Sequence, residues 1–418
     1  MSHERSFADI LVSGAGPAGM ASAVRARESG AKVVVLDDNP RPGGQIWRNE
    51  QLHPSSHQAS VWFRKFSASG VEVIAGARIV DGDAKRRSLI VEMEDRALKI
   101  EYRKLILATG ARERFLPFPG WTLPNAMGVG GLQALVKSGL PVAQKRIIVA
   151  GTGPLLLAAA AYFRRQGAIV PIIAEQASSI RLARFMLRLL RHPAKLFQAA
   201  ALRFCLRGTR YLTSCRVEAA NGNTRLESVR LRRGDQLWQE DCDYLAIAYG
   251  FRPNVELAVL LGCQADAFGV RVDRFQQSSQ EDIYCAGECT GVGGVELSIL
   301  KGEIAGYAAT GQTDLAARLF GALRKARHFA AVLESTFILG TALKNLALPD
   351  TIVCRCEDVT WQRLQSMESW RSAKLYTRCG MGPCQGRVCG PILEFLLGFH
   401  PEGVRPPAFP AALETLVE

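Results

Sequence analysis

The chain begins with an apolar strand, a glycine turn, a helix and a second apolar strand. Residues 8–13 (ADILVS) are almost wholly apolar, small and apolar residues follow at helical spacing from Ala18 to about Ser29, and residues 31–37 (AKVVVLD) form the next run. Short runs rich in valine, isoleucine and leucine predict buried strands. Strand, helix and strand in this order predict a βαβ unit with two parallel strands.

The same order of elements returns at Lys145. Residues 146–151 (RIIVAG) predict a strand, an alanine-rich stretch from Pro154 to about Gln166 predicts a helix, and residues 168–175 (AIVPIIAE) predict another strand. A second βαβ unit so far along the chain predicts a second domain of the same kind.

Strands and a helix from residue 243 onward predict a return to the first domain, which is then discontinuous. The predicted fold class is α/β, with two Rossmann-like dinucleotide-binding domains and a small cysteine-rich domain. The expected boundaries are 1–112 and 243–315 for the first domain, 113–242 for the second, 316–349 for a helical linker and 350–418 for the cysteine-rich domain.

The composition is that of an ordinary globular protein. The chain has 418 residues, of which 48% are hydrophobic and 22% charged, which is room for two or three domains. It lacks a charge-free run of about 18 apolar residues. Charged residues at the N-terminus lead straight into a strand, without a signal-peptide pattern. We therefore expect a cytoplasmic protein with no transmembrane segment.

The formal net charge of the chain is +13. Part of this excess lies in residues 180–210, where basic and apolar residues mix at helical spacing and predict a basic helical insertion in the second domain. Zinc-finger, RNP and basic-leucine patterns are missing from the sequence, so we expect no nucleic-acid partner. The insertion could pack on its own domain, contact a partner subunit or lie peripherally on a membrane, and the sequence leaves these alternatives open.

A glycine-rich turn follows the first strand. Gly14, Gly16 and Gly19 form G-A-G-P-A-G between the strand and the helix, and Asp37 ends the next strand. Such glycines let the backbone turn tightly and approach a pyrophosphate at the helix N-terminus, while the acid accepts hydrogen bonds from a ribose. The residues expected to bind this nucleotide are Gly14, Gly16, Pro17, Ala18, Gly19, Asp37 and Asp38.

Three other segments indicate which nucleotide the first site binds. Residues 105–110 (LILATG) and 283–288 (IYCAGE) resemble the mid-domain motif and the second flavin motif of FAD-containing pyridine-nucleotide reductases. Residues 43–47 (GGQIW) resemble the segment that lies near the flavin ring in those enzymes. The resemblance implies FAD as the cofactor. The further contacts it implies are Gly44, Gln45, Thr109, Gly110, Gly287 and Glu288.

The second glycine turn lacks one glycine of the pattern. Gly151 and Gly153 occupy the first two positions, Leu156 stands at the third, and Glu175 ends the following strand. The acid suits a ribose diol and would repel the 2′-phosphate of NADP, so NAD or another adenine nucleotide is the candidate ligand. A vestigial nucleotide fold kept as a scaffold explains the pattern equally well, and the sequence leaves both alternatives open.

The chain has 11 cysteines, and five of them lie between residues 354 and 389. Cys354 and Cys356 form C-x-C, Cys379 and Cys384 form C-x4-C, and Cys389 follows. Four thiolates on two tight turns can hold a [2Fe-2S] cluster or a tetrahedral zinc ion. We favour the cluster, because zinc knuckles use C-x2-C pairs and because a flavin in the same chain gives an electron relay a purpose.

The motifs GAGPAG, LILATG, GFRPN (residues 250–254), CAGE and CRCEDV…TRCGMGPCQGRVC occur in this order over almost the whole chain. In this order they resemble the flavoprotein alpha subunits of heteromeric bacterial amine and imino acid dehydrogenases. The cysteine-rich part resembles the bacterioferritin-associated ferredoxin type. The resemblance implies a fold of the pyridine-nucleotide-disulfide reductase type with a small ferredoxin-like [2Fe-2S] domain. By this analogy the cluster ligands are Cys354, Cys356, Cys379 and Cys384. Cys389 is either a plain core residue or an alternative ligand, and the sequence leaves both alternatives open.

The resemblance also implies a function. In such complexes a separate beta subunit oxidises the amine at its own flavin, and a chain like this one accepts or relays the electrons through FAD and the cluster. We therefore expect an FAD-dependent oxidoreductase, the electron-transfer subunit of an enzyme that oxidises a small amine, imino acid or opine, such as D-hydroxyproline or glycine. A second flavin subunit is the expected partner, and a small third subunit is a further candidate.

Two other functions fit the sequence. One is a self-standing NADH-dependent flavoprotein reductase that uses Gly151, Gly153 and Glu175 for NADH. The other is a scaffold subunit whose bound nucleotides are structural. Catalytic residues stay unassigned, because the sequence offers no convincing acid–base pair for amine oxidation.

Overall fold

The computed structural model describes residues 4–52, 54, 56–401 and 403–416, which form two compact units. The segment expected as the cysteine-rich domain, residues 350–418, is divided between these units. Its last part joins unit 1, where the backbone N–H of Ala408 donates to the carbonyl oxygen of Val80 at 2.6 Å. Unit 1 comprises Met1–Arg112, Phe251–Ala330 and Gly403–Glu418, and unit 2 comprises Glu113–Gly250 and Ala331–Glu402.

Unit 1 is built on a seven-stranded sheet with the order β3-β2-β1-β6-β5-β4, and β19 also pairs with β6. β1 pairs parallel with β2 and β6, whereas β4 and β5 are antiparallel. Val12 lies opposite Val35 on one side and Ile106 on the other, and all three are buried, as expected of a sheet covered on both faces. The bounds are β1 (Glu4–Ser13), β2 (Val33–Asp37), β3 (Glu72–Ala75), β4 (Arg78–Asp83), β5 (Ser88–Glu92), β6 (Ala97–Leu107) and β19 (Ile283–Cys285).

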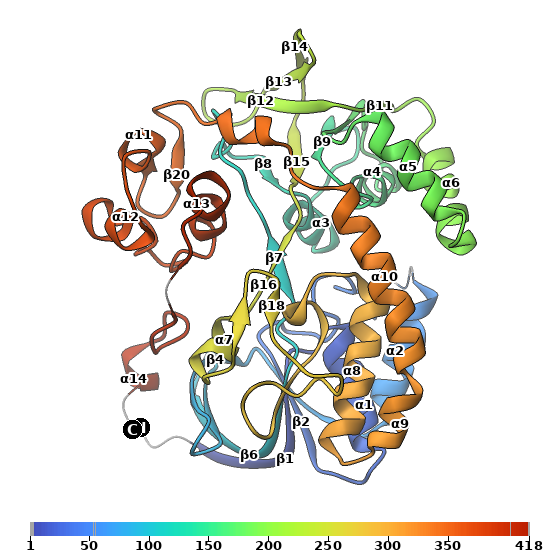
Figure 1. Ribbon diagram of the computed structural model, residues 1–418, viewed down its shortest axis with the longest axis vertical. Coiled ribbons are helices and arrows are strands. Elements are labelled where there is room, and N and C mark those ends of the chain that lie inside the picture. Colours follow the sequence, from blue (N-terminus) through green and yellow to red (C-terminus); the bar gives the residue numbers. More distant parts are fainter. Residues whose placement is uncertain (1–3, 53, 55, 402, 417–418) are drawn as a thin grey trace. The chain divides into compact units, whose positions relative to one another are not determined.

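Helices α1 (Pro17–Arg27) and α8 (Val295–Ala309) lie side by side in unit 1, although the sequence places them far apart (Figure 1). A Cβ atom at Gly302 would overlap with the carbonyl oxygen of Ala18, and one at Gly306 would overlap with that of Ser22. Two glycines about one helical turn apart therefore bring α8 against the backbone at the start of α1. The other elements of unit 1 are α2 (His57–Ala68), β16 (Phe251–Pro253), α7 (Glu256–Leu260), β17 (Ala265–Asp266), β18 (Gly269–Val270), η1 (Gly287–Thr290), α9 (Thr313–Arg318) and α14 (Leu413–Leu416).

Unit 2 carries a five-stranded sheet with the order β11-β10-β9-β15-β8 and a three-stranded sheet with the order β12-β13-β14. All neighbouring strands of the larger sheet are parallel. α4 (Leu155–Arg165) connects β9 (Ile147–Gly151) to β10 (Ile172–Glu175) and forms the second predicted βαβ unit. Parallel sheets with helical crossovers in both units confirm the predicted α/β fold class.

The other elements of unit 2 include the predicted basic insertion, which folds as two helices after β10. These are α5 (Ser179–Leu189) and α6 (Pro193–Cys205). The remaining bounds are β8 (Ala126–Gly128), α3 (Val129–Lys137), β11 (Arg210–Leu212), β12 (Cys215–Asn221), β13 (Ser228–Arg233), β14 (Gln236–Asp241), β15 (Tyr244–Ala248) and η2 (Thr341–Asn345). β7 (Ala111–Glu113) and α10 (Phe320–Thr336) each contain residues of both units.

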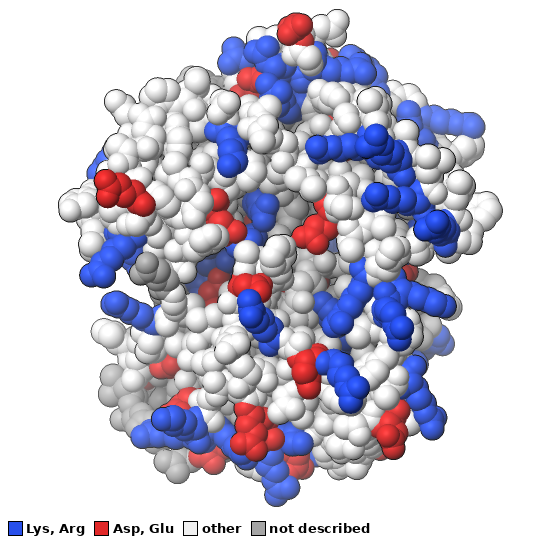
Figure 2. Space-filling view, in the orientation of Figure 1, with Lys and Arg blue, Asp and Glu red and all other residues white. Residues whose placement is uncertain are grey.

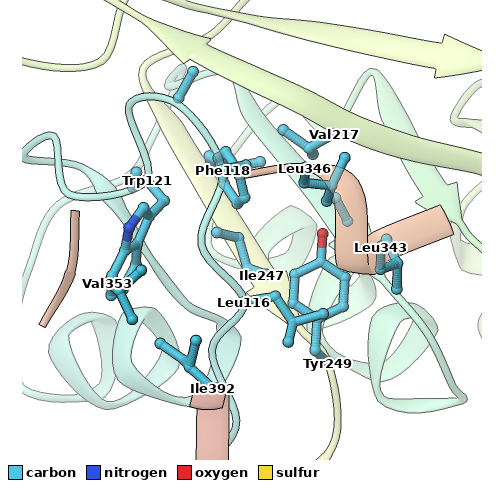
Figure 3. Packing of buried hydrophobic residues seen from close by; sticks show 14 of the residues in the cluster. Leu116, Phe118, Trp121, Val217, Ile247, Tyr249, Leu343, Leu346, Val353 and Ile392 are labelled. Atoms are coloured by element: carbon cyan, nitrogen blue, oxygen red, sulfur yellow. The ribbon is translucent and has the colours of Figure 1, made fainter. Parts of the chain in front are cut away.

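The cysteine-rich segment is part of the core of unit 2. Val353 and Ile392 pack in the same cluster as Leu116 and Trp121 (Figure 3). The indole N–H of Trp121 donates to the carbonyl oxygen of Ile352 at 2.6 Å, so the two parts of the unit are also joined by a hydrogen bond. The elements of this segment are β20 (Ile352–Cys354), β21 (Val359–Thr360), α11 (Trp361–Leu364), α12 (Trp370–Thr377) and α13 (Cys389–Leu397).

Candidate functional site

The first glycine turn is close-packed at two of its glycines and open at the third. Gly14 has a φ of +100°, and a Cβ atom there would lie 2.5 Å from the carbonyl oxygen of Ala108. A Cβ atom at Gly19 would overlap with the carbonyl oxygen of Gly14. At Gly16, whose φ is −73°, the nearest atom would be the Cα of Gly44 at 3.8 Å. The fold itself therefore requires glycine at positions 14 and 19. At Gly16 the absence of a side chain instead suits the close approach of an anion to the N-terminus of α1.

Asp37 lies beside this turn at the end of β2. Its carboxylate accepts a hydrogen bond from the backbone N–H of Ala15 at 2.5 Å, and from the backbone and side-chain N–H groups of Asn39 at 2.8 and 2.7 Å. The next residue, Asp38, is exposed, but partial desolvation of its carboxylate and the charge of Asp37 raise its pKa. The sequence thus places a fixed, hydrogen-bonded carboxylate where a nucleotide ribose would lie.

Two of the predicted flavin segments meet the start of α1. A Cβ atom at Gly44 would lie 3.0 Å from the Cα of Gly16, and one at Gly287 would lie 2.7 Å from the Cβ of Ala18. Gln45 follows Gly44 in the same loop. The structure therefore brings together glycines from three separate sequence motifs around one helix N-terminus, as the dinucleotide-binding pattern requires.

Thr109 and Gly110 follow β6 and are held by Asn254 of the GFRPN motif. The Thr109 hydroxyl donates to the carbonyl oxygen of Asn254 at 2.7 Å, and the Asn254 side-chain N–H donates back to the carbonyl oxygen of Thr109 at 2.8 Å. The backbone N–H of Asn254 donates to the carbonyl oxygen of Gly110 at 3.0 Å. Asn254 thus donates two hydrogen bonds to this small-residue turn and accepts one from it, which explains why these two motifs occur together.

A buried lysine, which the sequence motifs do not reveal, fixes the loop of the second flavin motif. The Lys301 ammonium donates to the carbonyl oxygens of Gly287, Thr290 and Gly291 at 3.3, 3.2 and 3.0 Å. Burial lowers the pKa of Lys301 to about 8, and burial raises the pKa of Glu288 in the same loop. The only signal in the sequence is a pair of charged residues, Lys301 and Glu303, inside the otherwise apolar run LSILKGEIAG.

In unit 2, the carboxylate of Glu175 is buried and fully occupied by hydrogen bonds within the protein. It accepts from the Thr152 hydroxyl at 2.7 Å, from the backbone N–H groups of Gly153 and Ala177 at 2.9 and 2.8 Å, and from the Tyr211 hydroxyl. Burial raises the pKa of Glu175. A ribose diol would have to replace some of these donors before it could use the carboxylate.

The second glycine turn has a phenylalanine beside it. Gly151 is required by the fold, because it has a φ of +134° and its Cβ would overlap with the carbonyl oxygen of Ala248. At Gly153, by contrast, the nearest atom to a Cβ would be the ring of Phe337 at 3.9 Å. That ring packs against Phe185, with the ring centroids 5.3 Å apart. An aromatic side chain of the same unit thus lies where a pyrophosphate would approach the turn.

Gln176 holds the segment that carries this phenylalanine. Its side-chain amide donates to the carbonyl oxygen of Ile338 at 2.9 Å and accepts from the backbone N–H of Gly340 at 3.0 Å. Leu156, which replaces the third glycine of the motif, is fully buried. The sequence shows that the third glycine is missing. It does not show that Phe337, far along the chain, lies beside the turn.

Three of the five clustered cysteines converge in unit 2. The sulfur atoms of Cys354, Cys379 and Cys389 all lie within 4.8 Å of one another, and all three residues are buried. Hydrogen bonds from the thiols of Cys379 and Cys389 lower the pKa of Cys354, and the backbone N–H of Gly380 also donates to its sulfur. Three buried sulfurs with backbone N–H groups around them form a donor set that fits an iron–sulfur centre.

The other two cysteines of this group form a pair. Cys356 is exposed, Cys384 is half-buried, and their thiols hydrogen-bond to each other. A Cβ atom at Gly382 would overlap with the Cβ of Cys356, so the fold requires a glycine there. The structure thus brings together two of the four predicted ligands, Cys354 and Cys379, with Cys389, which the sequence left as either a core residue or an alternative ligand. The regular spacing of residues 379, 384 and 389 was the available signal.

Comparison with known proteins identifies the family. The chain matches the family model for pyridine nucleotide-disulphide oxidoreductases over residues 8–311. It is 32% identical over 444 residues to hydrogen cyanide synthase subunit HcnB of Pseudomonas aeruginosa, with 96% of both chains covered. It is 31% identical over 431 residues to an opine oxidase subunit of Rhizobium meliloti, covering 92% of this chain and 81% of that one.

The solved structures support the same fold. L-proline dehydrogenase from P. horikoshii is similar over all of this chain and 81% of its own, with a TM-score of 0.74 and 18% sequence identity. Within the residues described, no helix has the length and apolar character needed to cross a membrane.

These comparisons confirm the predicted family resemblance and the predicted enzyme class. The two relatives named above are subunits of larger enzymes, which supports the expectation of partner subunits. The chain belongs to the pyridine nucleotide-disulphide oxidoreductase family and is an FAD-dependent oxidoreductase.

Proposed function

We propose that the chain is the electron-transfer subunit of a heteromeric dehydrogenase or oxidase that acts on a small amine, imino acid or opine. The observation that carries this proposal is the presence in one chain of an open glycine turn at a helix N-terminus and a buried triad of cysteine sulfurs. When bound, FAD takes up two electrons and can release them singly, and a [2Fe-2S] cluster carries one electron at a time.

Unit 1 supplies the residues that would hold FAD. The backbone at Gly16 and the first residues of α1 would bind the pyrophosphate, and Asp37 would accept hydrogen bonds from the ribose. Lys301 would keep the loop of the second flavin motif in place through its three carbonyl partners. The proposed contacts are Gly14, Gly16, Pro17, Ala18, Gly19, Asp37, Asp38, Gly44, Gln45, Thr109, Gly110, Gly287 and Glu288.

Unit 2 supplies the residues that would hold the cluster. A [2Fe-2S] unit bound by cysteine needs four thiolates, and the triad offers three. Cys356 and Cys384 lie on the same chain segments as the cysteines of the triad. One of these two residues would supply the fourth thiolate. We propose that four of the five thiolates are ligands, with Cys354 and Cys379 common to the expected set and to the triad. A cytoplasmic location would keep these thiols reduced.

The main alternative is a self-standing reductase that takes electrons from NADH at the second glycine turn. The saturated carboxylate of Glu175 and the ring of Phe337 beside Gly153 favour the electron-transfer subunit, because both stand where NADH would have to bind. Electrons would then come from a partner subunit that oxidises the substrate. The scaffold alternative predicts that neither the FAD nor the cysteines are needed for turnover.

Anaerobic reduction distinguishes the proposal from these alternatives. The purified chain should keep its flavin absorbance when it is mixed with NADH alone. The flavin should bleach when an amine substrate and the partner subunit are both added. Rapid bleaching by NADH alone would establish the reductase instead. Unchanged turnover of the complex after Cys354→Ser, with FAD retained, would favour the scaffold.

A further inference from the structure

Helices α5 and α6 of unit 2 form a surface that is both strongly basic and strongly apolar. Residues 179–210 contain seven arginines and one lysine but no aspartate or glutamate. This segment therefore carries a large share of the net charge of +13. The basic residues are Arg181, Arg184, Arg188, Arg191, Lys195, Arg203, Arg207 and Arg210.

α5 has an inner and an outer apolar stripe. Phe185 and Leu189, one turn apart, are buried against unit 2 and anchor the helix. Ile180, Leu187 and Leu190 lie at helical spacing on another side and are exposed, with Leu187 at 67%. Burial of Phe185 and Leu189 explains why α5 packs against unit 2. Nothing in the described part of unit 2 explains why the exposed stripe is apolar.

α6 continues the exposed surface. None of its residues, all of which belong to the described part of the chain, is buried. Phe197 and Phe204 are seven positions apart and so share a face, and they are 75% and 61% exposed. The guanidinium of Arg207 stacks on the Phe204 ring at 3.7 Å. The two helices contact each other and lie at the outer edge of the unit (Figure 1), where Figure 2 shows their basic side chains gathered.

We propose that this surface docks on an anionic lipid membrane. Helices that lie in the membrane interface carry arginine or lysine beside large apolar side chains, so that the apolar groups enter the acyl boundary and the cations reach the phosphates. Each exposed apolar residue of α5 and α6 has a basic neighbour within three positions, and acidic residues are absent from the segment.

A protein partner fits this surface less well. Protein interfaces are enriched in arginine, but their buried centre is depleted in charged residues as a whole, whereas here cations lie between the apolar side chains over both helices. A lipid surface accepts this mixture, since it offers hydrocarbon and phosphate together along the whole length of the helices. The attachment would be peripheral. It would hold the enzyme at the membrane without placing any part of the chain across it.

Vesicle sedimentation of the full-length chain tests the proposal. The probes are vesicles of phosphatidylcholine alone and of phosphatidylcholine with phosphatidylglycerol. The wild-type chain should bind the anionic vesicles, bind the neutral ones much more weakly, and release partly at high salt. The double variant Phe197→Glu/Phe204→Glu should bind anionic vesicles roughly a hundredfold more weakly, because it loses the insertion of two aromatic side chains.

The matched control is Phe268→Glu, which changes a residue that is 71% exposed in unit 1. This variant should bind the vesicles as the wild type does, and both variants should retain flavin absorbance and helical circular dichroism. Failure of the wild type to bind anionic vesicles would overturn the proposal. So would equal binding by the double variant. Loss of binding to a purified partner subunit in the double variant, with vesicle binding unchanged, would assign the surface to a protein instead.

Discussion

Replacing Gly16 by alanine separates FAD binding from folding. In the protein alone, the added methyl group would meet only the Cα of Gly44 at 3.8 Å, which is ordinary van der Waals contact. The φ of −73° is allowed for alanine. The change therefore costs only the weaker helix-capping of alanine at this position, which is about 1 kcal/mol or less.

Bound FAD should meet the same methyl group at the pyrophosphate. Forcing an extra methyl group into a close-packed contact typically costs about 1–3 kcal/mol. A loss of about 2 kcal/mol corresponds to roughly thirtyfold weaker binding. FAD affinity should therefore fall by about this factor while the unfolding free energy of the apoprotein changes little. At Gly19, where the methyl group would overlap with the backbone of Gly14, alanine should instead damage the fold itself.

Titration of the apoprotein with FAD, followed by flavin fluorescence, measures the affinity, and urea denaturation of the same samples measures stability. Gly321→Ala is the matched control, because a Cβ atom there would meet nothing within 4 Å. It should bind FAD normally and be slightly more stable, since alanine in a helix is favoured over glycine. If Gly16→Ala bound FAD within about twofold of the wild type, the pyrophosphate would not lie at this turn.

Three further predictions concern single side chains. Cys389→Ser should lose most of its iron and labile sulfide in chemical assays, whereas Cys205→Ser, at an exposed thiol outside the cluster, should retain both. The hydroxyl of Tyr249 is buried without a hydrogen-bond partner among the described residues, so Tyr249→Phe should keep or raise the unfolding free energy, by about 1 kcal/mol at most. Lys301 binds its proton less tightly in the folded chain, with a pKa of about 8 against 10.5 in the unfolded chain, so its contribution to stability should rise with pH between these values, by roughly 3 kcal/mol in total. Denaturation of the wild type and Lys301→Met across this range should show that the slope is lost in the variant, and an equal slope in both would contradict the assignment.

Features that depend on short stretches of sequence were predictable. The two βαβ units show themselves as apolar runs around glycine turns, because a buried parallel strand is apolar on both faces. The tight turn expected at Gly14 and Gly19 is present, since both glycines are required by close backbone contacts, and their contact with a nucleotide stays a prediction. The missing third glycine of the second turn was also visible, as Leu156.

Features that depend on packing between distant segments were not predictable in the same way. Phe337 reaches the second glycine turn from far along the chain, and no periodicity links the two. Lys301 became informative only when its three carbonyl partners were known. Cys389 joins the triad because α13 begins at that residue and turns its sulfur toward Cys354, which spacing alone does not specify.

The most direct test of the account is the cofactor content of the anaerobically purified chain. Iron, acid-labile sulfide, zinc and FAD should be measured on one sample, and electron paramagnetic resonance should be recorded after reduction with dithionite. The account predicts one FAD with iron and sulfide in equal amounts, each at about two per chain, and a resonance signal typical of a reduced [2Fe-2S] cluster. Zinc without labile sulfide, or FAD without any metal, would contradict the claim that this chain relays electrons from a flavin to an iron–sulfur cluster.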